Sequence, residues 1–451
     1  MKKLRQDMLH GSLFSGIVFY AVPIILTSVL QLLFNAVDIV VVGRYCGSIS
    51  VAAVSNTTEL INLITTLFIG LSVGTGVSVA HALGGRQEQT VHRIVHTALP
   101  LALISGAVLT VIGVAFSESF LLLMNTPKNV LPLSDVYMKI YFAGITFSMV
   151  YNFCASVLRA AGDTKGPLVY LLIAGVINAV LNILFVTVFR MDVAGVALAT
   201  VISQGFSAIL VVTALMRRTD SCKLILKKIW PYKQQLLKML KLGLPAGLQG
   251  ALFGISNVIV QSSINSFGDV LMSGNGAAAN IEGFIFFAFN AFYETAMNFT
   301  GQNAGAHQYK RIRKIYGICI GCAMTLTLAL SLLVYRFGPQ LLGIYITDSP
   351  EAIEYGMVRL SCVCLLYCLC TPQHITTGVL RGMGASLSPM LISVLGICGI
   401  RLIWIYTVFQ IPQYHTPQCL YLSYAVSWIV TFVFMLVDYH YIYKKRVKLD
   451  S

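Results

Sequence analysis

Charged side chains are scarce in this sequence. Asp, Glu, Lys and Arg make up 11% of its 451 residues, and only 17 of them are acidic; a soluble globular protein carries roughly 25% charged residues. Hydrophobic residues make up 57%, and the mean hydropathy is +0.79. A soluble fold of this size needs more polar surface than the chain supplies. We therefore expect an all-α polytopic membrane protein.

Two sequence motifs of known enzymes are also missing. The chain has no G-x-x-x-x-G-K-[ST] loop for ATP and no H-E-x-x-H. We expect that the protein is not an enzyme, that it needs no cofactor, and that an ion gradient or downhill flow drives it.

Four cysteines, Cys362, Cys364, Cys368 and Cys370, lie close together in the sequence. A metal site would call for His or carboxylates nearby, and residues 362 and 364 project from different faces of a helix. Small apolar packing within a membrane helix is the favoured interpretation, so we expect no metal site.

Twelve apolar runs are long enough to cross a bilayer of roughly 30 Å as helices. Several exceed 25 residues, which indicates tilt, kinks or protruding ends. The predicted spans cover residues 13–42, 51–82, 94–116, 136–158, 167–189, 193–215, 242–264, 271–303, 315–337, 355–380, 388–410 and 419–443.

Basic residues gather on one side of the predicted spans. With the N-terminus inside, the cytoplasmic segments hold 24 of the 31 Lys and Arg, the outer segments hold six, including Arg359, and Arg401 lies within a span. This bias indicates a plasma-membrane protein with both termini in the cytoplasm. The net charge of +14 is then explained by topology and anionic lipid, and we expect no nucleic-acid partner.

The chain also repeats itself. The segment Val157 to Gly162, followed by Pro167, returns 222 positions later as Val379 to Gly384, followed by Pro389. The same offset links Pro23 to Pro245. Two fused apolar repeats are typical of secondary transporters. We predict an N lobe at 1–215, a basic cytoplasmic linker at 216–241 and a C lobe at 242–451 that ends in a basic tail.

Motifs spread along the whole chain resemble those of the bacterial multidrug and toxic compound extrusion (MATE) family, within the multidrug/oligosaccharidyl-lipid/polysaccharide flippase group. They are Asn35 to Arg44, Leu158 to Thr164, Asn178 with Asn182, Val193 to Thr200, Gln302 to Ala306 and Leu380 to Gly384. The resemblance implies twelve helices in two parallel six-helix lobes around a central cavity.

The same resemblance implies a secondary antiporter that exports cationic or amphipathic small molecules in exchange for Na⁺ or H⁺. An alternative within the group is a flippase for lipids or lipid-linked oligosaccharides. It calls for several Arg or Lys to hold phosphate, whereas only Arg401 lies within the predicted spans. An ion channel would need repeated charge rings, which are not visible. We expect membrane lipids as neighbours and a monomer.

A buried charge in the first half marks the predicted coupling site. Charges within spans cost about 2.5–3.5 kcal/mol on insertion scales and usually have a function. Asp38 lies in the outer half of the first span, and Asn178 and Asn182, at i and i+4, share one face of the fifth. Thr200 lies near the start of the sixth. Family members carry a site for an ion or proton at the positions that match these four.

Two alternatives stay open at this site. Asp38 is either an ion or proton carrier or an interfacial residue that pairs with Arg44, and the asparagines either complete the site or join helices. Members of the group often have Asp at the position of Asn182. With Asn there, a single carboxylate should bind a cation more weakly.

Further polar and aromatic residues are candidates for the substrate cavity, since a polyspecific surface needs groups that can repack. In the second half, Glu282 and Arg401 lie at similar predicted depth, so we expect them to pair, either as a gate or as a structural lock. The full candidate set is Gln31, Phe34, Asn35, Asn152, Glu282, Tyr293, Glu294 and Arg401.

Overall fold

The computed structural model describes residues 6–124, 126–346 and 349–450, and these contain helices and no strand. The all-α prediction is confirmed. In chain order the elements are α1 Leu13–Tyr45, α2 Ser48–Gly84, α3 Glu88–Leu123, α4 Leu131–Ala143, α5 Ile145–Ala160, α6 Lys165–Ile183, η2 Leu184–Val188, α7 Asp192–Met216, η3 Leu226–Lys228, α8 Lys233–Asn265, α9 Asp269–Gly305, α10 Tyr309–Arg336, α11 Gly338–Tyr345, α12 Pro350–Arg359, η4 Leu360–Cys364, α13 Tyr367–Gly382, α14 Leu387–Ser393, η5 Val394–Gly399, α15 Ile400–Tyr406, η6 Val408–Gln410, η7 Pro412–Tyr414 and α16 Pro417–Asp450.

Most of these helices suit a bilayer in length and composition. Among the described residues, nine helices pass as membrane spans, and two bent helix pairs raise the number to eleven. The remaining predicted span, 271–303, corresponds to α9, which has 37 residues and lies outside that count. Buried Asn, Glu and Gln side chains make α9 less apolar than its neighbours. The protein is therefore a multi-pass membrane protein.

Two predicted spans are broken. The span at 136–158 is the pair α4 and α5, bent by 47°, and the span at 355–380 is the pair formed by 350–364 and α13, bent by 44°. Gly144 lies at the first break, and the π-helical turn η4 precedes the second. Glycine and π-turns are recognised causes of kinks. The two bends fall at corresponding places in the two halves.

The backbone confirms the duplication found in the sequence. Gly162 and Gly384 have φ values of 88° and 86°, and Gly47 and Gly268 have φ values of 92° and 94°. These left-handed conformations favour glycine because a Cβ would be strained there. The loops that join corresponding helices therefore have the same geometry in both repeats.

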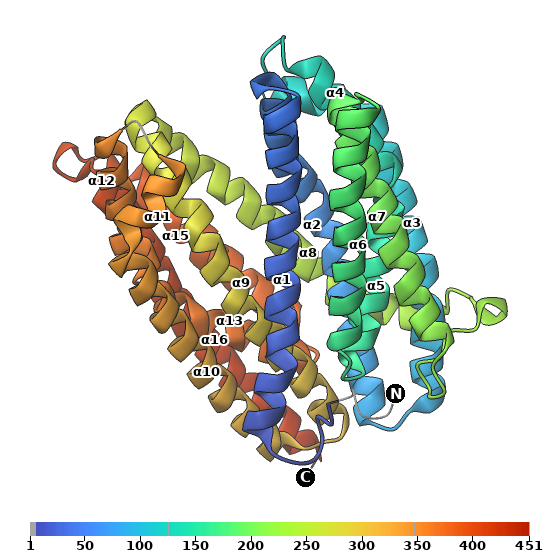
Figure 1. Ribbon diagram of the computed structural model, residues 1–451. Helices are drawn as coiled ribbons and strands as arrows, with labels where there is room; N and C mark the ends of the chain where they lie inside the picture. The colour runs from blue at the N-terminus through green and yellow to red at the C-terminus, as the bar shows by residue number, and fades with distance from the viewer. Residues whose placement is uncertain (1–5, 125, 347–348, 451) are drawn as a thin grey trace. The chain divides into compact units, whose positions relative to one another are not determined.

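Contacts divide the chain into two compact units (Figure 1). Unit 1 comprises Met1–Asp7 and Val22–Gly247, and unit 2 comprises Met8–Ala21 and Leu248–Ser451. The predicted lobes end at loops between spans, whereas the two units are defined by contacts between residues. The lobe boundaries therefore stay a prediction. Within unit 1, α6 and α7 lie side by side (Figure 1) and contact each other extensively.

Glycines bring α2 and the first part of α8 together inside unit 1. A Cβ added to Gly70 would collide with the backbone of Gly247, and one added to Gly74 would collide with the backbone around Gly243. Both helices thus carry glycines four residues apart on the contact face. Small residues at this spacing let membrane helices approach closely and pack by van der Waals contact.

We predict that Gly70→Leu lowers the thermal stability of the purified protein, because the new side chain has to displace backbone. Overpacking of this kind costs about 1–3 kcal/mol. Melting in detergent, followed by intrinsic fluorescence, measures the change. Gly276→Leu is the matched control, since a Cβ at Gly276 meets nothing within 4 Å. Equal melting temperatures for the two variants would contradict the role of the glycine contact.

Candidate functional site

The polar cluster of unit 1 forms around Asp38 on α1. The side chain is 7% exposed. The amide of Asn182 on α6 donates a hydrogen bond to Asp38 Oδ1, and Thr200 Oγ1 on α7 lies 3.4 Å from Asp38 Oδ2. Asn178 accepts from the Asn182 amide at 3.1 Å and donates to Thr200 at 3.3 Å. The structure thus brings all four predicted residues into one hydrogen-bonded group, which we call the Asp38 cluster.

All the partners of Asp38 in this cluster are neutral. No Lys or Arg of the described chain pairs with it, and Arg44 is exposed, so the interfacial pairing weighed above does not occur. Asn182 Oδ1 is buried and has no hydrogen-bond partner among the described residues. An unpaired buried acceptor costs free energy. The cluster therefore holds one carboxylate that can take a proton or a cation, and one unused amide oxygen that can accept a hydrogen bond or ligate a cation.

The packing of α1 on α6 sets this geometry. Gly175 precedes Asn178 by three residues and Asn182 by seven, so the three share one helix face. A Cβ at Gly175 would collide with the ring of Phe34, which lies one turn before Asp38 on α1. The missing side chain lets α1 approach closely enough for Asp38 to reach Asn182.

Two tyrosines were not predicted as part of this site. Tyr137 and Tyr141 on α4 interact electrostatically with Asp38, and their rings stack with centroids 6.4 Å apart. Their i, i+4 spacing is visible in the sequence, but nothing there shows that α4 brings them near Asp38.

In unit 2 the predicted pair of Glu282 and Arg401 is wrong. Glu282 on α9 is held instead by Arg359 on α12, whose Nε and Nη2 donate to its two carboxylate oxygens at 3.1 and 2.8 Å. Arg359 was expected in an outer segment, yet it is only 8% exposed. Similar predicted depth along a span does not say which helix faces α9. Arg359 and Arg381 are buried as well as Arg401.

Arg401 on α15 makes different contacts. Its Nε donates to Ser427 Oγ at 3.3 Å, and its guanidinium lies 3.9 Å from the centre of the Tyr424 ring. Tyr293, another candidate, accepts a hydrogen bond from Arg381, which also donates to Gln249 at 2.9 Å. Glu294 is half-buried, and its carbonyl accepts from Asn298.

The remaining cavity candidates are more exposed. On α1, Gln31 and Asn35 are exposed and Phe34 is half-buried. Asn152 on α5 is half-buried, and its amide donates to the carbonyl of Ser148 at 2.9 Å. Whether these residues contact substrate stays a prediction.

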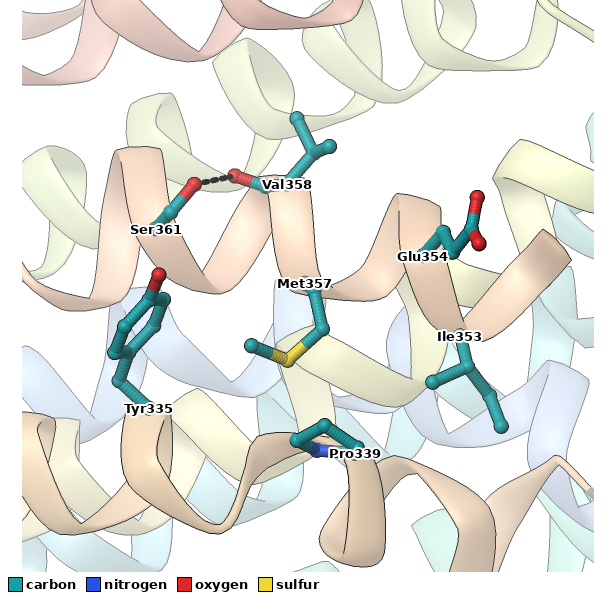
Figure 2. Close-up of a pocket in the computed structure, with 7 residues that line it drawn as sticks. All are labelled: Tyr335, Pro339, Ile353, Glu354, Met357, Val358 and Ser361. Atoms are coloured by element: carbon teal, nitrogen blue, oxygen red, sulfur yellow. Dashed lines mark hydrogen bonds between the residues drawn. The ribbon is translucent and has the colours of Figure 1, made fainter. Parts of the chain in front are cut away.

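A separate hollow of ≈ 500 Å³ lies in unit 2 between α10, α11 and α12. Figure 2 shows Met357 pointing toward Pro339, with Ser361 donating to the carbonyl of Val358. None of the predicted site residues lines this hollow. Its lining residues are Tyr335, Pro339, Ile353, Glu354, Met357, Val358 and Ser361.

The fold and the paired repeats define a class of membrane transporter, and comparison with known proteins identifies the family. The MatE family model matches twice, at residues 23–184 and 245–407, so it begins again after the same 222 residues. The chain belongs to the MatE family, the MATE transporters. The resemblance seen in the sequence is therefore confirmed.

Curated relatives cover almost the whole chain. It is 28% identical over 397 residues to the probable multidrug resistance protein YpnP of Bacillus subtilis, with 88% of each chain covered. It is 27% identical over 444 residues to the probable multidrug resistance protein YoeA of the same organism, with 96% of this chain and 95% of that protein covered.

Solved structures show the same fold. The chain is similar to the outward-facing conformation of a multidrug resistance MATE family transporter, with a TM-score of 0.88, 20% identity and 98% of each chain covered. It is also similar to the crystal structure of a MATE protein in a bent conformation, with a TM-score of 0.87, 21% identity and coverage of 97% and 98%.

Mutation of the buried ion pair between Glu282 and Arg359 tests its contribution to stability. We predict that Glu282→Gln lowers the free energy of unfolding by about 3–5 kcal/mol, because Arg359 is left as an unpaired buried charge. Replacing both residues together, as Glu282→Leu with Arg359→Met, should recover most of the loss. Melting of the two variants in detergent compares them. If the double variant melts below Glu282→Gln, the pair is not the source of the effect.

Proposed function

We propose that this MATE transporter is an antiporter that exports cationic or amphipathic small molecules in exchange for Na⁺ or H⁺, with Asp38 as the ion-carrying group. The observation that supports the proposal is the buried Asp38 carboxylate with only neutral partners. The names of the relatives, multidrug resistance proteins, support the class of cargo.

The Asn182 amide can interact with Asp38 both when the carboxylate is ionised and when it carries a proton or a cation. An amide presents a donor on one end and an acceptor on the other. With Asp38 ionised, the Asn182 Nδ2 group donates to the carboxylate, as observed. With a proton on Asp38, a rotated amide accepts that proton's hydrogen bond through Oδ1. For a metal cation, the carboxylate and Oδ1 are both oxygen ligands, which hard cations prefer.

Loading Asp38 should change the packing of three helices. The carboxylate connects α1 to α6 through Asn182 and to α7 through Thr200. A cation or proton that takes over these oxygens weakens the existing contacts, so the loaded and free states favour different helix arrangements. Substrate that favours one arrangement then competes with the ion, and rocking of the repeats alternates access.

The cellular setting follows from the same proposal. We place the transporter in the plasma membrane with both termini in the cytoplasm, surrounded by lipid, as a monomer and without a nucleic-acid partner. The positive charge bias along the chain supports this orientation.

We predict that Asp38→Asn abolishes gradient-driven transport while the protein still inserts and purifies normally. Asn keeps the size of the side chain but has no proton to exchange and no negative charge to attract a cation. Uptake of a fluorescent organic cation into inverted vesicles measures the effect. Glu59→Gln is the control, because it removes an exposed carboxylate from α2. Gradient-driven uptake by Asp38→Asn at the rate of the control would refute the carrier role.

A second prediction concerns Asn182. Asn182→Asp places another carboxylate in hydrogen-bond reach of Asp38, and each added charge strengthens cation binding in a buried site. The half-saturating concentration of the driving cation should fall about tenfold, which corresponds to about 1.4 kcal/mol. Proteoliposomes with separately imposed Na⁺ and pH gradients measure it and identify the cation.

Asn182→Ala should act in the opposite direction, because it removes the amide oxygen as well as the donor to Asp38. If neither Asn182 variant changes the cation dependence, the Asp38 cluster does not bind the coupling ion.

A further inference from the structure

Among the buried guanidinium groups of unit 2, those of Arg359 and Arg401 differ in how well they are paired. Arg359 is saturated on three nitrogens: Nε and Nη2 donate to Glu282, and Nη1 donates to Asn275 Oδ1 at 2.6 Å. Such a bidentate pair satisfies the charge and the donors together. Both carboxylate oxygens of Glu282 are engaged by this one partner.

Arg401 lacks such a counter-ion. It is 5% exposed, and a guanidinium has five N–H donors. Among the described residues only its Nε has a hydrogen bond, to the neutral hydroxyl of Ser427. Tyr424 covers one flat face of the group at 3.9 Å. That contact stabilises the charge but leaves the in-plane N–H groups unused, and a buried charge without such partners is costly.

A continuous row of aromatic side chains leads to this cation. Each ring contacts the next at centroid distances of 5.3 to 5.9 Å, and half-buried members of the row still present surface. We call it the aromatic wall. Its members, in order of contact, are Phe286, His374, Phe289, Tyr367, Trp428 and Tyr424.

An apolar aromatic row that ends in an unpaired guanidinium matches a particular kind of molecule. The ring system of an aromatic solute can pack on the wall, because aromatic rings prefer offset or edge contacts with one another. A carboxylate on the same solute can accept two parallel hydrogen bonds from the free edge of Arg401. A cation would be repelled by the same group.

The repeat strengthens the assignment. At the offset of 222, Arg401 corresponds to position 179, next to Asn178 in the Asp38 cluster. Ser427 and Tyr424 lie on α16 and Thr200 on α7, which are the last spans of their halves. Corresponding spans of the two repeats therefore carry part of an acidic centre in unit 1 and of a basic centre in unit 2.

We propose that Arg401, with Tyr424 and the aromatic wall, forms a binding site for the carboxylate group of an aromatic, amphipathic anion or zwitterion. The site is separate from the Asp38 cluster, and it does not depend on which cation drives transport.

Equilibrium dialysis of the full-length protein in detergent tests the proposal with two probes of nearly the same shape, 1-naphthoate and 1-naphthamide. We expect the wild type to bind the carboxylate at least tenfold more tightly than the amide. Arg401→Gln should lose this preference. Arg401→Lys should keep part of it, because the charge stays while the bidentate edge is lost. Ser427→Ala should keep all of it, since Ser427 contacts only Nε.

Competition with other anions tests whether the site requires an aromatic ring as well as a negative charge. Inorganic phosphate and laurate should each displace 1-naphthoate at least tenfold less effectively than unlabelled 1-naphthoate, because neither offers a ring to the wall. Equal displacement by either would overturn the aromatic part of the proposal.

The Asp38→Asn variant distinguishes failure of the Arg401 site from failure of the carrier role of Asp38. It should bind 1-naphthoate like the wild type, whatever it does to transport. An unchanged carboxylate preference in Arg401→Gln would refute the site. If that variant does not purify as a single species, loss of the preference in Tyr424→Leu, with Tyr424→Phe retaining it, carries the test.

Discussion

One ionisable carboxylate held among neutral amides and a hydroxyl is the constraint on which the first unit is built. A charge in the hydrocarbon region costs about 2.5–3.5 kcal/mol on insertion scales, so Asp38 has to be surrounded by donors. Asn182 supplies one, and it reaches Asp38 only because Gly175 leaves room for Phe34. The helix contact and the polar cluster thus depend on each other. A change in the charge of Asp38 acts directly on the packing of α1.

Helix periodicity and the family resemblance together predicted which residues meet in unit 1. The i, i+4 spacing of Asn178 and Asn182 puts both on one face, and spans of known direction place Asp38 and Thr200 at comparable depth. The structure joins all four side chains. Repeats and hydropathy likewise predicted the helical membrane fold, because both are properties of long segments and not of single contacts.

The sequence was less informative where the answer depends on which helix faces which. Glu282 has two cations at similar depth, and it pairs with Arg359 because α12 packs against α9. Hydropathy placed Arg359 at a span edge, where a charge is ordinary. The bend that follows it at η4 is also invisible to hydropathy. Tyr137 and Tyr141 were missed for the same reason, since their role depends on the position of α4.

Duplication explains how one chain comes to hold two interior sites of opposite charge. The repeats share backbone features, such as the left-handed glycines at 162 and 384 and the bent spans, because these set the shape of the bundle. Interior side chains are not under that constraint. At corresponding depth one half has a carboxylate with amide partners, and the other has a guanidinium on a tyrosine ring. The shared backbone of the repeats therefore accommodates interior groups of opposite charge.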